Sequence, residues 1–272
     1  MAYNLKEVVA NKPSRFTAGH RMCAGCGAPV VGRMILRALK EDDHAVICNA
    51  TGCMEVSTFI YPYTAWTDSF IHTAFECAGA TLSGAEAAYN SLKKQGKLPA
   101  DEDTKFIAFG GDGGTYDIGL QSLSGAMERG HDMVYVCYDN GAYMNTGIQR
   151  SSATPRFADT TTSPAGKQIP GKQQSRKDFT EIMAEHHIPY VGQTAAFANF
   201  KDLYEKAHKA DNITANKQAQ QIESLNNVKK TGIMIMESDA LFESIYKKLM
   251  GVRSIHHNVI VRNLLISLGC KS

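Results

Sequence analysis

The fold of this chain is decided by the stretch Lys105-Phe106-Ile107-Ala108-Phe109-Gly110-Gly111-Asp112-Gly113-Gly114. Its first half is a short apolar run that glycines end abruptly, as is typical of a buried parallel strand followed by a turn. Beyond the turn, Leu120, Leu123 and Met127 recur at helical spacing, and Thr115 and Asp117 are candidate capping residues. The stretch therefore predicts a strand, a glycine turn and a helix, an arrangement that aims backbone N–H groups at a phosphate.

A second polar cluster follows the next predicted strand, residues 131–138. Asn140 offers a side-chain carbonyl there, and Ala142 offers a backbone carbonyl. Asp112 lies where the first turn opens, and the ends of neighbouring parallel strands meet at one edge of a sheet. Magnesium prefers such hard oxygen ligands together with water and phosphate. Taken alone, Gly-Asp-Gly could equally be a strand–helix turn that binds nothing. The two clusters together predict a site for a magnesium-bound diphosphate, and thiamine diphosphate is the expected cofactor.

The cysteines form a second candidate site. Cys23 and Cys26 make a Cys-x-x-Cys, and Cys53 follows in Ala50-Thr51-Gly52-Cys53. Seven cysteines without a signal peptide lead us to expect a reducing, cytoplasmic compartment, where this spacing favours a metal centre over disulfides. From the cysteines alone, an iron–sulfur cluster, a zinc knuckle and a redox dithiol remain alternatives. Cys48 and Cys137 are expected in the core.

The motifs in combination resemble one family, the β subunits of the 2-oxoacid:ferredoxin oxidoreductases, with the pyruvate branch closest. The resemblance extends from about Phe16 to about Ala210. It rests on Cys-Ala-Gly-Cys-Gly-Ala, Ala-Thr-Gly-Cys, Tyr-Pro-Tyr-Thr-Ala-Trp, Gly-Gly-Asp-Gly-Gly and Tyr-Asp-Asn-x-x-Tyr-Met-Asn-Thr-Gly-Ile-Gln-Arg-Ser.

The resemblance implies oxidative decarboxylation of pyruvate to acetyl-CoA and carbon dioxide. It implies thiamine diphosphate and Mg²⁺ as cofactors, with electrons leaving singly through a [4Fe–4S] cluster to ferredoxin. The glutamate that activates the cofactor lies on the α subunit in this family, so this chain needs that partner, and further γ and ferredoxin-like δ subunits are implied. A branched-chain or other 2-oxoacid substrate is an alternative, since many substrate contacts lie on the α subunit.

The resemblance also assigns roles to residues. Those implied to bind magnesium are Asp112, Asn140 and the Ala142 carbonyl. Those implied to bind the cofactor are Thr51, Gly52, Gly111, Asp112, Gly113, Gly114, Asn140 and Asn145. Asn145 is further implied to act in catalysis as a hydrogen-bond donor facing the reacting carbon. Three cluster ligands are implied at Cys23, Cys26 and Cys53.

One departure from the family concerns the fourth cluster ligand. The family's late Ser-x-Cys-Pro-x-Gly-Trp motif has no counterpart here, and the only later cysteine is Cys270. Either Cys270 substitutes, or the cluster lacks a protein ligand, or the segment after residue 210 is altered relative to the family. Because the fourth cysteine motif is absent, a degenerate, non-catalytic β subunit is also an alternative. A non-redox thiamine decarboxylase is a further alternative, which the cysteine set disfavours.

The length and charge of the chain limit its organisation. With 272 residues and a net charge of only +2, it has no basic stripe for nucleic acid and no apolar span for a membrane. We expect an α/β fold of the thiamine diphosphate-binding type, a mostly parallel sheet with helices on both faces. Residues 1–210 are expected to form the catalytic domain, and residues 211–272 a divergent segment packing on it. The polar stretch 147–177 is predicted to be a lid or a partner-contacting loop, or else a plain surface loop.

Overall fold

The structure is a computed structural model, and it describes residues 4–197, 199–220 and 231–237. Side chains are described as far as Asp211. The elements follow in the order α1 (Leu5–Asn11), α2 (Gly27–Ala38), β1 (His44–Ala50), α3 (Cys53–Thr58), β2 (Phe59–Ile60), β3 (Tyr63–Thr64), β4 (Ser69–Thr73), α4 (Ala78–Lys94), β5 (Thr104–Gly111), η1 (Gly114–Ile118), α5 (Leu120–Arg129), β6 (Met133–Asp139), α6 (Phe179–Ala184), β7 (Tyr190–Ala195), α7 (Phe200–Gln220) and β8 (Thr231–Glu237).

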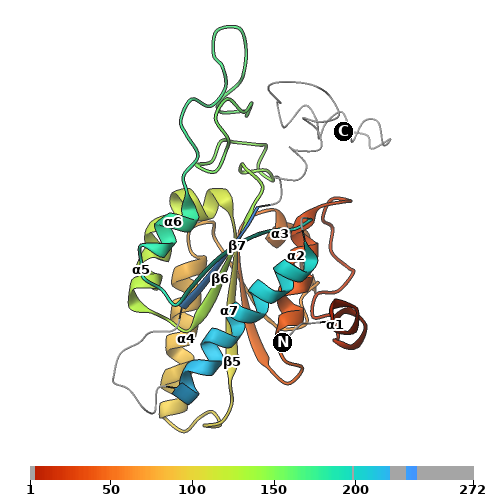
Figure 1. Cartoon of the computed structure of the whole chain (residues 1–272), viewed down its shortest axis with the longest axis vertical. Coiled ribbons are helices and arrows are strands. Elements are labelled where there is room, and N and C mark those ends of the chain that lie inside the picture. The colour runs from red at the N-terminus through yellow and green to blue at the C-terminus, as the bar shows by residue number, and fades with distance from the viewer. Residues whose placement is uncertain (1–3, 198, 221–230, 238–272) are drawn as a thin grey trace.

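Six strands form one parallel sheet in the order β4-β1-β5-β6-β8-β7, which confirms the predicted α/β class (Figure 1). The strands predicted around residues 105–109 and 131–138 are β5 and β6, and they pair directly, with Gly111 beside Tyr138. Strand β8 lies between β6 and β7 although it follows both in sequence. The short strands β2 and β3 form a separate antiparallel hairpin.

Helices cover both faces of the sheet because the side chains of a buried strand alternate between the two. On β5, Ile107 and Phe109 pack in one cluster with residues of α2 and α7. Their neighbours Phe106 and Ala108 pack in the other, with residues of α4, α5 and α6. Cys48 and Cys137 belong to the second cluster and are fully buried, as predicted.

Gly27, at the start of α2, is required by close packing. A Cβ at this position would lie 2.8 Å from the Cβ of Ala196, just beyond β7. Side chains cannot approach so closely, so only glycine lets α2 begin directly after the Cys-x-x-Cys.

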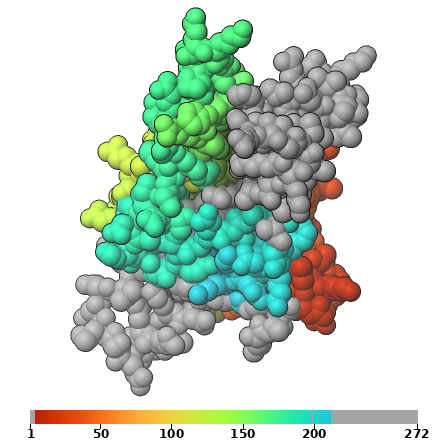
Figure 2. Space-filling view, turned by 45° about the horizontal axis from the view of Figure 1, so that its top comes forward, coloured from red at the N-terminus to blue at the C-terminus, as the bar shows by residue number. Residues whose placement is uncertain are grey.

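The segment 147–177, called the lid segment below, rises beyond the carboxyl edge of the sheet (Figure 1) and projects from the body in the space-filling view (Figure 2). Its base is buried: Ser151 is 0% exposed and Lys172 is 1% exposed. Lys172 donates from Nζ to the backbone oxygens of Ser152 and Thr154, at 3.3 and 2.5 Å. Isolated bridges such as Ala165 to Pro170 are its only ladder contacts within the part of the chain described.

The predicted capping roles of Thr115 and Asp117 are wrong. The chain after Gly113 first forms the π-helical turn η1, and α5 begins after Gly119 without a side-chain cap. Thr115 Oγ1 donates back to the Gly111 oxygen at 2.7 Å, and Asp117 accepts from Ser152 at the base of the lid segment. Both side chains therefore tie the glycine turn to its surroundings. Among the residues described, no helix is long and apolar enough to cross a membrane.

Candidate active site

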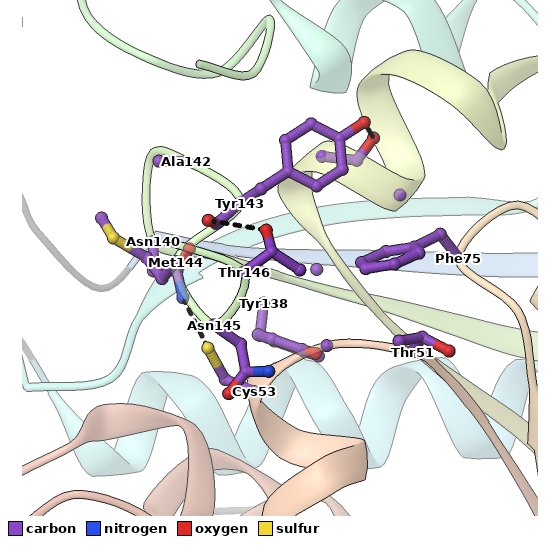
Figure 3. Close-up of a pocket in the computed structure, with 14 residues that line it drawn as sticks. Thr51, Cys53, Phe75, Tyr138, Asn140, Ala142, Tyr143, Met144, Asn145 and Thr146 are labelled. Atoms are coloured by element: carbon purple, nitrogen blue, oxygen red, sulfur yellow. Dashed lines mark hydrogen bonds between the residues drawn. The ribbon is translucent and has the colours of Figure 1, made fainter. Parts of the chain in front are cut away.

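The candidate site lies at the carboxyl ends of three adjacent strands. After β1 come Thr51, Gly52 and Cys53; after β5 comes Asp112; after β6 comes Asn140. Since β1, β5 and β6 are neighbours in a parallel sheet, these three ends meet. The pocket between them has about 290 Å³ of empty space, including the solvent at its mouth (Figure 3).

Three oxygen atoms converge beside this pocket. The side-chain oxygen of Asn140 lies 2.9 Å from Asp112 Oδ1 and 2.9 Å from the backbone oxygen of Ala142. Oxygen atoms without a shared proton repel at this distance. Ligands at the Mg–O distance of 2.0–2.1 Å stand about 2.9 Å apart along an octahedron edge. In this orientation of the amide, the oxygen atoms and their spacing therefore fit Mg²⁺. In the opposite orientation, the amide nitrogen donates to the Asp112 and Ala142 oxygens and satisfies them without a cation.

Asp112 is held in a dry and negative environment. It is 0% exposed, and burial raises the pKa of its carboxyl well above the ordinary value, with the nearby Asp139 raising it further. Three hydrogen bonds oppose this rise: Ser151 Oγ donates at 2.5 Å, the Asn140 backbone N–H donates at 3.3 Å, and the third comes from the backbone of Asp112 itself. Asp139 forms an ion pair with Arg176, at 2.5 Å. A divalent cation at Asp112 would relieve the remaining repulsion.

The glycine turn leaves the pocket open toward the backbone. Gly111, Gly113 and Gly114 all line it. A Cβ on Gly113 would lie 2.4 Å from the ring of Tyr143, and one on Gly114 would lie 2.7 Å from the Phe75 oxygen. The turn thus brings main-chain atoms to the pocket wall, as a diphosphate requires.

The three predicted cluster cysteines lie near one another. Cys23 is exposed, whereas Cys26 and Cys53 are half-buried. The pKa of the Cys53 thiol is raised to about 11, mainly by burial and in smaller part by charge repulsion from Cys26 and Cys23. The described residues contain no group of three or more His, Cys, Asp or Glu side chains that could hold a metal ion. Cys270 lies outside the described residues.

The remaining predicted residues also reach the pocket. Thr51 and Gly52 line it, and Thr51 is fixed by its backbone N–H and its hydroxyl, which donate to the Thr73 oxygen at 2.9 and 3.1 Å. Asn145 lines the pocket next to Cys53 (Figure 3). Its backbone hydrogen-bonds to the Cys53 thiol. The structure thus gathers Asp112, Asn140, Ala142 and Asn145 at one site.

Several residues of the site were not predicted from the sequence. Tyr138, Phe75, Tyr143, Met144 and Thr146 line the pocket. Ser151 binds Asp112 across 39 residues of sequence. Tyr138 directly precedes Asp139 and Asn140, so its place at a strand end was a usable signal. No local pattern marks Ser151 as a partner of Asp112.

Comparisons with known proteins identify the family of the chain. Residues 50–216 match the family model "Thiamine pyrophosphate enzyme, C-terminal TPP binding domain". The chain is 51% identical over 217 residues to "Pyruvate synthase subunit PorB" of Thermotoga maritima, covering 78% of this chain and 67% of the relative. It is 57% identical over 203 residues to the protein of the same name from Methanocaldococcus jannaschii, covering 74% and 67%. It is 43% identical over 210 residues to "Ketoisovalerate oxidoreductase subunit VorB" of Pyrococcus furiosus, covering 77% and 66%.

Among solved structures, the fold resembles "2-oxoglutarate:ferredoxin oxidoreductase from Magnetococcus marinus with 2-oxoglutarate, coenzyme A and succinyl-CoA bound", with a TM-score of 0.64 at 20% identity. That match covers 84% of this chain and 67% of the other. The fold and the matched domain define a thiamine pyrophosphate enzyme. Within this class, the chain belongs to the β-subunit family of the 2-oxoacid:ferredoxin oxidoreductases. The matches to the relatives named above span about two thirds of their length.

Proposed function

We propose that the chain is the β subunit of a pyruvate:ferredoxin oxidoreductase. The complex would convert pyruvate, coenzyme A and two oxidised ferredoxins to acetyl-CoA, carbon dioxide, two reduced ferredoxins and a proton. The observation that carries the proposal is the convergence of the Asp112 carboxylate, the Asn140 side-chain amide and the Ala142 backbone oxygen beside a glycine-lined pocket that Cys53 also lines. The relatives named pyruvate synthase subunits support the choice of pyruvate.

In this proposal the chain's own residues bind the cofactor, orient it and donate hydrogen bonds. Asp112, Asn140 and the Ala142 carbonyl hold Mg²⁺, and the backbone at Gly111, Gly113 and Gly114 faces the diphosphate. Thiamine diphosphate, when bound, supplies the carbanion chemistry that decarboxylation of a 2-oxoacid needs. Asn145 is the proposed catalytic hydrogen-bond donor, which its position on the pocket wall allows. Thr51 and Gly52 also line the pocket.

Electrons are proposed to leave through a [4Fe–4S] cluster bound by Cys23, Cys26 and Cys53. The proximity of Cys23 and Cys26 to Cys53 supports this role. For the fourth ligand, the three alternatives of the sequence analysis stay open: Cys270, a cluster that lacks a fourth protein ligand, or a segment after residue 210 that is altered relative to the family. No disulfide links the six cysteines within the described residues, in keeping with a reducing, cytoplasmic compartment. The proposed partners are an α subunit that supplies the activating glutamate, γ and δ subunits, and ferredoxin. We also propose that residues 211–272 pack on the domain formed by residues 1–210, which β8 in the central sheet supports.

The test is anaerobic co-expression with the α subunit, followed by thiamine, iron and sulfide analysis. Electron paramagnetic resonance (EPR) after addition of pyruvate and coenzyme A should show a reduced cluster. With 2-ketoisovalerate in place of pyruvate, the cluster should be reduced more slowly. Faster reduction with 2-ketoisovalerate would favour the branched-chain alternative, which we consider because one relative, 43% identical, is named a ketoisovalerate oxidoreductase subunit. Stoichiometric thiamine without iron would refute the oxidoreductase proposal and favour the degenerate subunit.

A pair of variants tests the magnesium site. Asp112→Ala should abolish retention of thiamine diphosphate while leaving the fold intact, because it removes the buried carboxylate. Asp101→Ala makes the same change at an exposed position before β5, at the far end of the sheet. It should retain the cofactor. Retention by Asp112→Ala would show that the magnesium site is assigned wrongly.

A further inference from the structure

Asp139, the last residue of β6, holds the turn that carries Asn140 and Ala142 at the pocket wall. Asp139 is 3% exposed, and its Oδ1 accepts the backbone N–H of Gly141 at 3.0 Å, in the middle of that turn. Gly141 has a φ of 80°, which glycine adopts at little cost. The other oxygen, Oδ2, accepts from the hydroxyl of Tyr116 at 2.8 Å. The place of this carboxylate therefore sets the place of the turn.

Arg176 reaches the same carboxylate from the far end of the lid segment. Its Nη2 donates to Asp139 Oδ2 at 2.5 Å, and its Nη1 donates to the Ala153 backbone oxygen at 3.1 Å. The side chain of Arg176 is 31% exposed and that of Asp139 is 2% exposed, so the cation lies on the solvent side of the pair. The planar fork of a guanidinium suits such a double contact, which an ammonium group reproduces only in part. One side chain thus joins the end of β6 to both ends of the lid segment.

The backbone around Arg176 closes the base of the lid segment as well. The N–H of Lys177 donates to the Ser152 oxygen at 3.1 Å, and its Nζ donates to the Tyr116 oxygen at 2.6 Å. The N–H of Ser152 in turn donates to Asp117 Oδ2 at 3.0 Å. Figure 1 shows the lid segment leaving the body after β6 and returning to it at α6. Residues 152–153 and 176–177 therefore attach the lid segment to the body beside the glycine turn.

The ion pair also affects the charge balance at the pocket. Asp112 and Asp139 are both buried and lie close enough for their carboxylates to repel each other. Arg176 supplies a cation to this pair from a segment that lies outside the sheet. Loss of the guanidinium would leave the repulsion less balanced and the turn less firmly held. The geometry of the pocket therefore depends on the attachment of the lid segment.

We propose that Arg176 is a positioning residue that makes closure of the lid segment and binding of the cofactor depend on each other. This inference rests on the proposed function, because it takes thiamine diphosphate as the ligand of the pocket. With the lid segment closed, Arg176 holds Asp139, and Asp139 holds the turn in the form that receives the diphosphate. Coupling between two events is reciprocal, so the bound cofactor should in turn hold the lid segment closed.

The test is hydrogen–deuterium exchange of the complex with the α subunit, measured by mass spectrometry with and without thiamine diphosphate and Mg²⁺. In the wild type, the cofactor should slow exchange in peptides of the lid segment about tenfold. The N–H of Phe157, which donates to the Lys172 oxygen at 2.6 Å, is one group that reports closure. Unchanged exchange in the wild type would overturn the proposal, even if no variant folds.

Two variants of Arg176 separate its charge from its fork of donors. Arg176→Met removes both, so cofactor affinity, measured by isothermal titration calorimetry, should fall about tenfold, and the protection of the lid segment by the cofactor should fall below about threefold. Arg176→Lys keeps the charge without the fork. It should regain part of the cofactor affinity but leave the protection as low as in Arg176→Met. Full recovery of the protection in Arg176→Lys would contradict the role of the fork.

Arg156→Met is the matched control, because it makes the same change at an exposed arginine of the lid segment that lies 4.8 Å over the ring of Phe157. Its cofactor affinity and its lid protection should equal those of the wild type. Wild-type values in Arg176→Met would overturn the proposal. A loss of affinity with unchanged protection would do the same, because charge alone would then explain the effect. A wild-type complex that binds no thiamine diphosphate would instead refute the proposed function.

Discussion

Gly113→Ala adds one methyl group to the wall of the candidate pocket. The backbone of Gly113 has φ −61° and ψ −48°, which alanine adopts without strain, so the effect comes from contact alone. The new Cβ would lie 2.4 Å from the Cε1 and Cζ atoms of Tyr143. Normal carbon contact is about 3.5 Å, so the ring must retreat by about 1 Å.

Tyr143 cannot retreat alone. Its hydroxyl donates to the Gly113 oxygen at 2.8 Å and its backbone N–H donates to the Gln149 oxygen at 2.9 Å. A shift of the ring therefore moves the loop that carries Asn140 and Asn145. Overpacking of this kind costs about 1–3 kcal/mol of stability. A displacement of about 1 Å at a catalytic loop can cost about a hundredfold in rate.

The assays are urea unfolding of the chain and kcat of the complex with pyruvate. Gly84→Ala is the matched control, because Gly84 is exposed within α4 and its added Cβ meets no atom within 4 Å. That change should stabilise the chain by about 0.5–1 kcal/mol, as alanine does within a helix, and leave kcat unchanged. Gly113→Ala with wild-type kcat and stability would refute the close contact between the turn and Tyr143.

Three further predictions concern buried polar groups. Ser151→Ala removes the hydroxyl that orients Asp112 and should weaken magnesium affinity about 10–100-fold, measured as the Mg²⁺ dependence of thiamine diphosphate binding; unchanged dependence would contradict it. Lys172→Met removes the hydrogen bonds from Nζ to the base of the lid segment and should therefore speed chymotrypsin cleavage of that segment about tenfold. An unchanged cleavage rate would contradict this prediction. Burial raises the pKa of Asp211 to about 8, so the folded chain keeps a proton that the unfolded chain releases near pH 4. Stability should therefore fall as pH rises from about 4 to 8, by up to about 1.4 kcal/mol per pH unit in urea titrations, and Asp211→Asn should flatten this dependence.

The strands that carry the site were predictable because their signals are local. The apolar run before Gly110 and the one before Asn140 are β5 and β6, and they do pair as neighbours. A parallel strand buried on both faces is a continuous apolar run, and glycine ends it visibly. The capping roles of Thr115 and Asp117 were wrong because a hydroxyl or carboxylate near a helix start has competing partners: Thr115 donates to the Gly111 oxygen four residues earlier, and Asp117 accepts from Ser152 across the fold.

The order of the strands had no comparable signal. Strand β8 lies between β6 and β7, and nothing in its residues distinguishes a central position from an edge. Sheet order depends on how crossover helices pack, which is a property of the whole chain.

The sequence alone therefore determined the residue types of the site and their places at strand ends: an aspartate after β5, an asparagine after β6 and cysteines around α2 and α3. Local periodicity and covalent neighbours are enough to establish such features. The contacts among them came from tertiary packing. The amide of Asn140 meets Cys53 across 87 residues, and Ser151 meets Asp112 across 39. Contacts of this range arise only when the parallel register brings separate strand ends to one edge, and no local pattern encodes that register.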